Sequence, residues 1–505
     1  MIEADVHSSL RDFLRQHGNR NFPHHLTMAR LIARALRLGR PALMQTGSSV
    51  SKYCLSYLTP ILVGDWSVVI VAPTSTQQYL LETEIPQLLG WLGKTKKVRI
   101  SDRWTPQDQL VLTSPQSWLS DRLKEQRNFP PQLPTIVDRA DDLEEWTRDL
   151  LTLSITNADW EDLQSSLPQH QELIRDIKIK LTKSIFARPQ NPYQNYVLLD
   201  SELDLIKALC LKLQQNDSLT GKLQQFWLQI KDRSNIAWIA RDRHQGSFTI
   251  NLAPAQVSHY LKPIWQQQPV VIIGSFLDSE VDASTYQQQV GLNGEILSLK
   301  FAPNRQNDHI QLYLPDRFPM PNSPDYRGAF IEQSLLLVGL CAEGKRLIVV
   351  IADDIPLQGQ VGAALAAEFG SRVRVENIDV ADNSVENSIL ICGWSFWKQN
   401  QDALPIPRLL IIATLPIPSL ENPLVANLVA YYKSQHQDWF RLYLLPTALK
   451  TLEQTVVPLR ESQSIVALLD NRVNFRSYGK TILSALEPCA RINYIDPTWF
   501  GYPDS

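Results

Sequence analysis

The sequence predicts an α/β protein with two domains, each built on a parallel sheet whose strands are joined by crossover helices. Two patterns indicate this class: short apolar runs alternate with helix-length segments over residues 42–150, and the alternation restarts after residue 345. Parallel strands need such crossovers because the chain must return to the same end of the sheet. The length of 505 residues is a third indication, since chains of this size divide into more than one core.

The first half begins with a helical pattern at residues 24–39, where apolar side chains recur every three or four positions and Gly39 gives a C-terminal stop. Apolar runs then predict strands at residues 42–44, 68–72 and 110–113, and a further strand within LPTIVDRADD. A proline-rich connector, LYLPDRFPMPNSPDY, separates this half from the second, where the alternation of strands and helices begins again.

Residues 151–235 differ in amino-acid composition and hydrophobic pattern from the segments on either side. They form long polar helical segments rich in glutamine, leucine and lysine, and we read no strand pattern in them. Strand patterns return with SNIAWIARDR and SFTINLAP. We therefore expect a first domain made of residues 1–150 and 236–300, interrupted by a helical insertion at 151–235, and a second domain at 301–505.

The composition limits the classes of partner. Hydrophobic residues make up 44% and charged residues 20%, as in globular proteins, and the formal net charge is -3. A nucleic-acid surface must therefore be a local patch. No apolar run reaches the roughly 18–20 residues that span a bilayer, so we expect no membrane contact and a cytoplasmic location. The five cysteines lie far apart without a CxxC pair, which argues against zinc or an iron–sulfur cluster.

The stretch TGSSVSKY follows the first strand and has part of a phosphate-binding loop, G-x-x-x-x-G-K-[ST]. Gly47 and Lys52 are in register with that pattern. Ser51 replaces the second glycine, and Tyr53 replaces the hydroxyl residue that holds Mg²⁺. The candidate nucleotide-binding residues are Gly47, Ser48, Ser49, Ser51 and Lys52. The alternative interpretation is a polar turn between a strand and a helix.

Two long segments of the second half resemble the DinG/XPD branch of the superfamily-two helicases. GWSFWKQNQDALPIPRLLIIATLPIPSLENPL is similar to that family's SFWEGVD segment and the strand after it, and FRLYLLPTALKTLEQTVVPLRESQ to its last motif. The resemblance extends from the helix at 24–39 to about residue 486. It implies two RecA-like P-loop NTPase domains that enclose ATP and Mg²⁺, an arch-like insertion, and movement along single-stranded nucleic acid.

Carried over residue by residue, the resemblance gives two candidate catalytic residues: Asp138, which is also the Mg²⁺ ligand, and Arg460, the terminal arginine of the last motif. Arg139 stands in place of the glutamate that activates water, and Val457 in place of the arginine finger. Losing a positioned base typically lowers the rate about 10²–10⁴-fold. We therefore expect weakened binding of ATP and Mg²⁺ and slow or absent hydrolysis. The alternative for the acidic run at Asp138 is that it caps the helix that follows.

Basic and aromatic residues are interleaved at WLGKTKKVRISDRW and GWSFWK, which suits a single strand of nucleic acid. The candidate contacts are Lys96, Lys97, Arg99, Trp397 and Lys398. The alternatives are a solvated loop for the first segment and burial of the aromatic residues for the second.

Three hypotheses therefore remain open. The first is a protein that binds nucleic acid, with DNA as the expected partner, and whose ATPase is weak or lost. The second is an active DNA helicase in which other residues compensate for the altered motifs. The third is a scaffold for protein partners.

Overall fold

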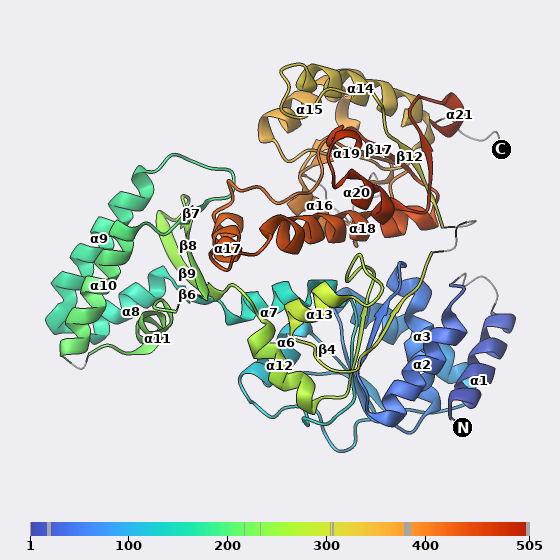
Figure 1. Cartoon of the computed structure of the whole chain (residues 1–505), viewed down its shortest axis with the longest axis horizontal. Helices are drawn as coiled ribbons and strands as arrows, with labels where there is room; N and C mark the ends of the chain where they lie inside the picture. Colours follow the sequence, from blue (N-terminus) through green and yellow to red (C-terminus); the bar gives the residue numbers. More distant parts are fainter. Residues whose placement is uncertain are drawn as a thin grey trace.

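The computed structural model describes residues 2–500 apart from 18–21, 217, 233, 304, 306–307 and 378–384. The chain forms two lobes with a lateral insertion (Figure 1). Each lobe contains a seven-stranded parallel sheet, in the orders β11-β1-β10-β5-β2-β4-β3 and β14-β15-β13-β16-β17-β12-β18. The predicted fold class, two RecA-like domains with an insertion in the first, is confirmed.

The five inner strands of the first lobe are buried, as expected for a parallel sheet that helices cover on both faces, and the edge strands β3 and β11 are partly exposed. The strands of this sheet are β1 (Ala42–Gln45), β2 (Val68–Val71), β3 (Val98–Ile100), β4 (Leu110–Thr113), β5 (Thr135–Val137), β10 (Val270–Gly274) and β11 (Leu297–Lys300). One face packs against α1 (Ile2–Gln16), α2 (His25–Leu38), α3 (Val50–Val63), α4 (Thr74–Tyr79), the π-helical turn η1 (Leu80–Glu84) and α5 (Ile85–Leu92). The other face packs against α6 (Pro115–Leu123), α7 (Leu143–Leu151), α12 (Ser258–Gln267) and α13 (Ser284–Val290).

The second lobe repeats this three-layer arrangement. Its strands are β12 (Ile310–Tyr313), β13 (Ile348–Ile351), β14 (Val373–Val375), β15 (Ile389–Cys392), β16 (Leu409–Ile412), β17 (Ile465–Leu468) and β18 (Cys489–Ile492). Its helices are α14 (Tyr326–Cys341), α15 (Ile355–Phe369), α16 (Trp394–Asn400), α17 (Pro423–Ser434), α18 (Leu445–Glu461), α19 (Arg472–Phe475), α20 (Gly479–Leu486) and α21 (Pro497–Phe500). Apolar cores lie on both faces of the sheet.

The insertion combines helices with a small antiparallel sheet. The helices are α8 (Asn157–Ser166), α9 (Gln171–Ala187), α10 (Asp200–Gln215) and α11 (Gly221–Gln229). They pack on four strands in the order β6-β9-β8-β7, which are β6 (Leu153–Ile155), β7 (Asn195–Val197), β8 (Asn235–Asp242) and β9 (Ser247–Pro254). The insertion therefore extends to Pro254.

Two details of the predicted insertion were wrong. Residues 151–235 include the strands β6 and β7, whose three residues each are too few to give a period-two pattern. The boundary expected at residue 235 was also wrong: β8 and β9 are strands as predicted, but they pair with β6 and β7 and not with the first-lobe sheet. A strand pattern does not reveal which sheet the strand joins.

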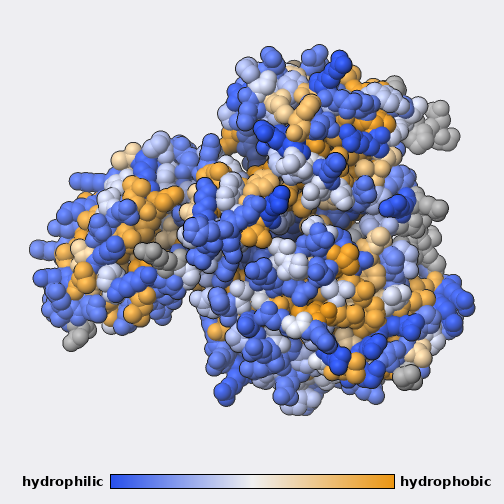
Figure 2. All heavy atoms as spheres, viewed as in Figure 1, coloured by the Kyte–Doolittle hydropathy of each residue, from blue (hydrophilic) through white to orange (hydrophobic). Residues whose placement is uncertain are grey.

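The insertion also contacts the second lobe. Helix α17 lies between the two bodies (Figure 1), and Leu428 on it packs with Ile236 and Ala253 of the insertion sheet. Asn427 donates a hydrogen bond to the Ala237 carbonyl over 2.8 Å. The visible face is largely hydrophilic, with apolar patches that include one where the insertion and the lobes meet (Figure 2). Among the described residues, no helix is both long and apolar enough to span a bilayer.

Candidate functional site: the cleft between the lobes

The predicted phosphate loop lies at the carboxyl end of β1, facing the second lobe. Its backbone is tied to the neighbouring strand β10, because the Thr46 and Gly47 amides donate to the carbonyls of Gly274 and Ser275 over 2.9 and 3.0 Å. Gly47 has φ +58°, and a Cβ there would lie 3.2 Å from a side-chain atom of Pro303. The loop therefore brings together the predicted residues Gly47, Ser48, Ser49, Ser51 and Lys52 at the start of α3.

Two carboxylates from outside the loop bind Lys52 and Ser49, which are the loop residues suited to binding phosphate. Lys52 Nζ lies 2.6 Å from Asp308 Oδ1 and 3.9 Å from Glu461 Oε1. Ser49, at the N-cap of α3, donates its amide and its hydroxyl to Glu461 Oε1 over 3.2 and 2.7 Å. Asp308 precedes β12, and Glu461 is the last residue of α18, so both anions come from the second-lobe side of the cleft. Burial raises the pKa of Glu461, while the bonds from Ser49 and the charge of Lys52 lower it.

Asp138, the predicted Mg²⁺ ligand, is held by two tyrosines. Tyr53 and Tyr57 lie one turn apart on α3 and donate to Asp138 Oδ1 and Oδ2 over 2.5 and 2.7 Å. The Arg139 amide donates to Oδ1 over 2.9 Å. Asp138 is fully buried, and this burial raises its pKa although all three hydrogen bonds lower it.

These contacts do not fit a magnesium ion. Mg²⁺ requires near-octahedral oxygen ligands and usually keeps several waters. Here phenol groups fill the space beside both oxygens of Asp138, and a tyrosine stands where a short hydroxyl would bind the metal. No cluster of three or more His, Cys, Asp or Glu suited to a metal is found within the described part of the chain. These contacts argue against Asp138 as a metal ligand, and that role stays a prediction.

Arg460, the predicted catalytic arginine, points into the core of the second lobe. Its guanidinium binds both oxygens of Glu453 over 2.8 Å each and donates to the Ala485 carbonyl over 2.7 Å. Only 1% of its side chain is exposed. A buried guanidinium needs such acceptors, and Glu453 supplies them from two turns earlier on α18. The pairing with Glu453 inside one lobe argues against a catalytic role for Arg460, which stays a prediction.

The next two acids of the run have different partners: Asp141 binds the segment after β10 in the first lobe, and Asp142 binds lysines of the second lobe. Asp141 accepts hydrogen bonds from the Ser275 amide and hydroxyl and from the Phe276 amide, over 3.2, 3.0 and 2.7 Å. Asp142 lies 3.1 Å from Lys450 and 3.4 Å from Lys398, both in the second lobe. Asp142 stands at the N-cap of α7, as the alternative interpretation expects, but its side chain makes no capping hydrogen bond to the helix.

The residues predicted to bind nucleic acid are mostly engaged within the protein. Lys96 Nζ donates to the carbonyls of Ile61, Gly64 and Trp66, at the C-terminal end of α3, and burial lowers its pKa to about 8. Arg99 pairs with Asp108 over 2.7 and 2.6 Å.

The remaining three candidates differ in exposure. Trp397 is buried in the second-lobe core, and Lys398 binds Glu145 across the cleft over 2.6 Å. Lys97 is exposed and lies 3.2 Å from Gln107. As a set, the predicted residues do not form a free cationic surface.

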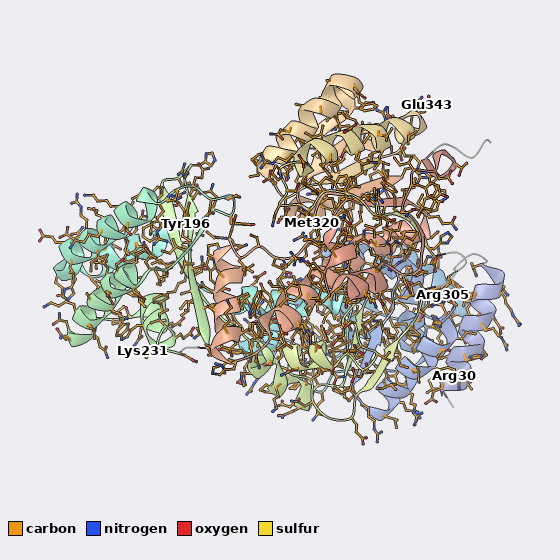
Figure 3. The ribbon with its side chains drawn as sticks, turned by 45° about the horizontal axis from the view of Figure 1, so that its top comes forward. Arg30, Tyr196, Lys231, Arg305, Met320 and Glu343 are labelled. Atoms are coloured by element: carbon orange, nitrogen blue, oxygen red, sulfur yellow. The ribbon has the colours of Figure 1, made fainter. Side chains whose placement is uncertain are left out.

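Two cavities remain between the lobes. One, of about 320 Å³, is lined by Ser48, Tyr53, Arg139 and Trp397 among others. The second, of about 350 Å³, is lined by Gly47 and Glu453 among others and reaches Arg305, which is labelled in Figure 3. Arg139 also forms an ion pair with Asp402 across the cleft.

Comparison with known proteins shows which proteins this chain is similar to. A family model described as "Helicase C-terminal domain" matches residues 365–489. The ATP-dependent DNA helicase YoaA of Haemophilus influenzae is 23% identical over 324 residues, which are 59% of this chain and 49% of YoaA. YoaA of Escherichia coli K12 is 32% identical over 111 residues, or 21% of this chain and 18% of that protein. These matches make the chain similar to the DinG/XPD-like helicases.

Solved structures show the same fold at low identity. An apo XPD structure has a TM-score of 0.60 at 13% identity and covers 92% of this chain and 100% of its own. An XPD helicase structure has a TM-score of 0.61 at 12% identity, covering 93% and 99%. Both lobes of this DinG/XPD-like chain thus have XPD-like counterparts, while the chain spans about half or less of the YoaA relatives.

The sequence analysis missed the residues that define this cleft. Tyr57 is four positions after Tyr53, so the shared helix face was a usable signal. Asp308 and Glu461 gave none, because they meet Lys52 and Ser49 from 256 and 412 positions away.

Proposed function

We propose that this DinG/XPD-like chain binds single-stranded nucleic acid, with DNA as the expected partner, and does not couple binding to ATP hydrolysis. The observation that carries the proposal is the engagement of both Asp138 oxygens by Tyr53 and Tyr57. A motor of this class needs a divalent ion between protein and phosphates to neutralise charge in the transition state. The contacts around Arg460 add to the argument, since its guanidinium is occupied by Glu453.

We predict that the protein binds ATP with reduced affinity. Lys52 and Ser49 are suited to phosphate, but a nucleotide would first have to displace the carboxylates of Asp308 and Glu461. Mg²⁺ would bring no compensating ligand from Asp138. We therefore expect any nucleotide binding to be weak and independent of Mg²⁺.

Nucleic-acid binding is supported by the DNA-helicase relatives and by one surface of the second lobe, where half-buried aromatic residues lie among exposed ones and cations. This aromatic–basic surface comprises Lys433, Trp439, Phe440, Arg441, Phe475, Arg476 and Tyr478. Lys433 Nζ lies 5.2 Å from the centre of the Trp439 ring, and the rings of Phe440 and Tyr478 are 5.2 Å apart. Phe475 is 65% exposed, which is unusual for so large an apolar residue. Aromatic faces with neighbouring cations are what unpaired bases and their phosphates require.

Two measurements test the proposal. The first is ATP turnover with and without single-stranded DNA; we expect it to stay far below about 1 per second, and turnover at or above that rate would favour an active helicase. The second is the affinity for a fluorescent oligonucleotide as a function of salt. Each neutralised phosphate contributes a slope of about -0.7 in log K against log salt. A slope near zero would reject nucleic-acid binding and favour a protein scaffold.

A further inference from the structure

The two carboxylates that contact the phosphate loop from the second-lobe side bear on how the lobes are held together. We propose that Asp308 and Glu461 take the place of nucleotide phosphates and keep the cleft closed without a nucleotide. This inference goes beyond the proposed function, because it concerns closure of the cleft whether or not a nucleic acid is bound.

The geometry of Glu461 matches that of a bound anion. Its Oε1 accepts two hydrogen bonds from Ser49, one of them from the backbone amide at the start of α3, and lies 3.9 Å from Lys52 Nζ. The first amides of a helix and its positive dipole end favour an anion at this point. A lysine beside them completes the set of groups that a phosphate loop offers. Glu461 therefore makes the contacts with the loop that a phosphate oxygen would make.

Asp308 supplies the second anionic contact. Its carboxylate is 2.6 Å from Lys52 Nζ, and Asp308 is only 5% exposed. The side chains of Lys52 and Glu461 are 18% and 17% exposed. Separating partly buried charges leaves each one poorly solvated, so breaking the contact is unfavourable. Because the anions belong to the chain itself, their effective concentration at the loop is high, and a free nucleotide must compete with them.

Other ion pairs cross the cleft without touching the loop. Arg139 pairs with Asp402, and Asp142 with Lys450. They help to hold the lobes but leave the phosphate-binding groups unaffected. Asp402 is therefore a matched control: its substitution removes a cross-lobe ion pair while Lys52 and Ser49 keep their carboxylates.

The experiment titrates inorganic pyrophosphate, without Mg²⁺, into the wild-type protein and an Asp308→Asn/Glu461→Gln variant while thermal unfolding is followed. We expect the wild type to show no shift of Tm at millimolar pyrophosphate and the variant to bind at least tenfold more tightly. Adding Lys52→Ala to the variant should abolish the gain. Asp402→Asn alone should show none.

Hydrogen exchange gives the second readout. The amides at the start of α3 should exchange faster in the Asp308→Asn/Glu461→Gln variant than in the wild type, and pyrophosphate should slow them again. Wild-type binding as tight as that of the variant, or unchanged exchange in a folded variant, would overturn the inference. If the double variant does not fold, Glu461→Gln alone keeps the shape at Ser49 and is tested in the same way. If the wild-type protein does not bind the oligonucleotide, that result counts against the proposed function and not against this inference.

Discussion

The hydroxyl of Tyr53 donates a hydrogen bond to Asp138 over 2.5 Å, and this contact joins the two chain positions that a Mg²⁺ ion would bridge in a phosphate-loop enzyme. Tyr57 binds the other oxygen of the same carboxylate. Two hydroxyl groups, one turn apart on one helix, thus bind both oxygens of Asp138. The change at position 53 and the burial of Asp138 are therefore two parts of one structural arrangement.

Tyr53→Phe should destabilise the protein. It removes one of three hydrogen-bond donors to a fully buried carboxylate, and a hydrogen bond to a charged group typically contributes about 1.5–3 kcal/mol. Urea unfolding measures the loss. Tyr494→Phe is the control, since Tyr494 is 60% exposed and its substitution should have little effect. If the site were a hidden metal centre, Mg²⁺ would raise the Tm of the wild type, whereas we expect no shift.

Asp138→Asn should stabilise the protein, and the gain should depend on pH. Burial raises the pKa of Asp138 above its ordinary value of 3.8, so in the window between 3.8 and the raised value the folded state binds a proton that the unfolded state does not. Stability of the wild type therefore falls as pH rises through this window. A pKa that is higher by one in the folded state than in the unfolded state corresponds to about 1.4 kcal/mol. Asparagine has no such dependence.

The measurement is thermal unfolding of wild type and Asp138→Asn at pH 4 and pH 8. The Tm difference in favour of Asp138→Asn should be small at pH 4 and larger at pH 8. Asp141, whose pKa is also raised by burial, is present in both proteins, so its contribution cancels in the comparison. A variant that is less stable than the wild type at pH 8 would contradict the prediction.

Arg460→Ala should destabilise the second lobe by about 3–5 kcal/mol, because it leaves the Glu453 carboxylate buried without its partner. Arg460→Met combined with Glu453→Leu should recover most of the loss, since apolar residues can replace a buried ion pair. Urea unfolding of the three proteins checks this. A loss of ATP turnover without any loss of stability would instead indicate a catalytic arginine.

Much of the fold could be predicted because buried parallel strands are continuous apolar runs. The expected strand at residues 110–113 is β4, and the helix expected at 24–39 is α2 with Gly39 as its left-handed cap. The candidate phosphate loop was also found, since its residues are adjacent in sequence. What failed depended on distant pairing: the sheet that β8 joins, and the partners of Lys52 and Ser49. Ion pairs across hundreds of residues leave no local pattern.

The last prediction concerns the aromatic–basic surface. Phe475→Ala should weaken binding of a single-stranded oligonucleotide without lowering stability, because the side chain is 65% exposed. Stacking of a base on an aromatic ring contributes about 1–3 kcal/mol, which corresponds to about 5–150-fold in Kd. Trp439→Ala should act in the same direction. Tyr260, which is 45% exposed on the first lobe, gives the matched control, and Tyr260→Ala should bind like the wild type.

Arg441 tests the phosphate contacts of the same surface. Its side chain is 81% exposed, and its contact with Asp438 is long, at 3.6 Å. An exposed pair of this kind contributes little to stability. Arg441→Gln should therefore leave the Tm unchanged and reduce the steepness of the salt dependence by about 0.7 for each phosphate that the guanidinium neutralises in the wild type. Fluorescence anisotropy at several salt concentrations gives both slopes. Equal slopes for Arg441→Gln and wild type, together with wild-type affinity for Phe475→Ala, would move the nucleic-acid path away from this surface.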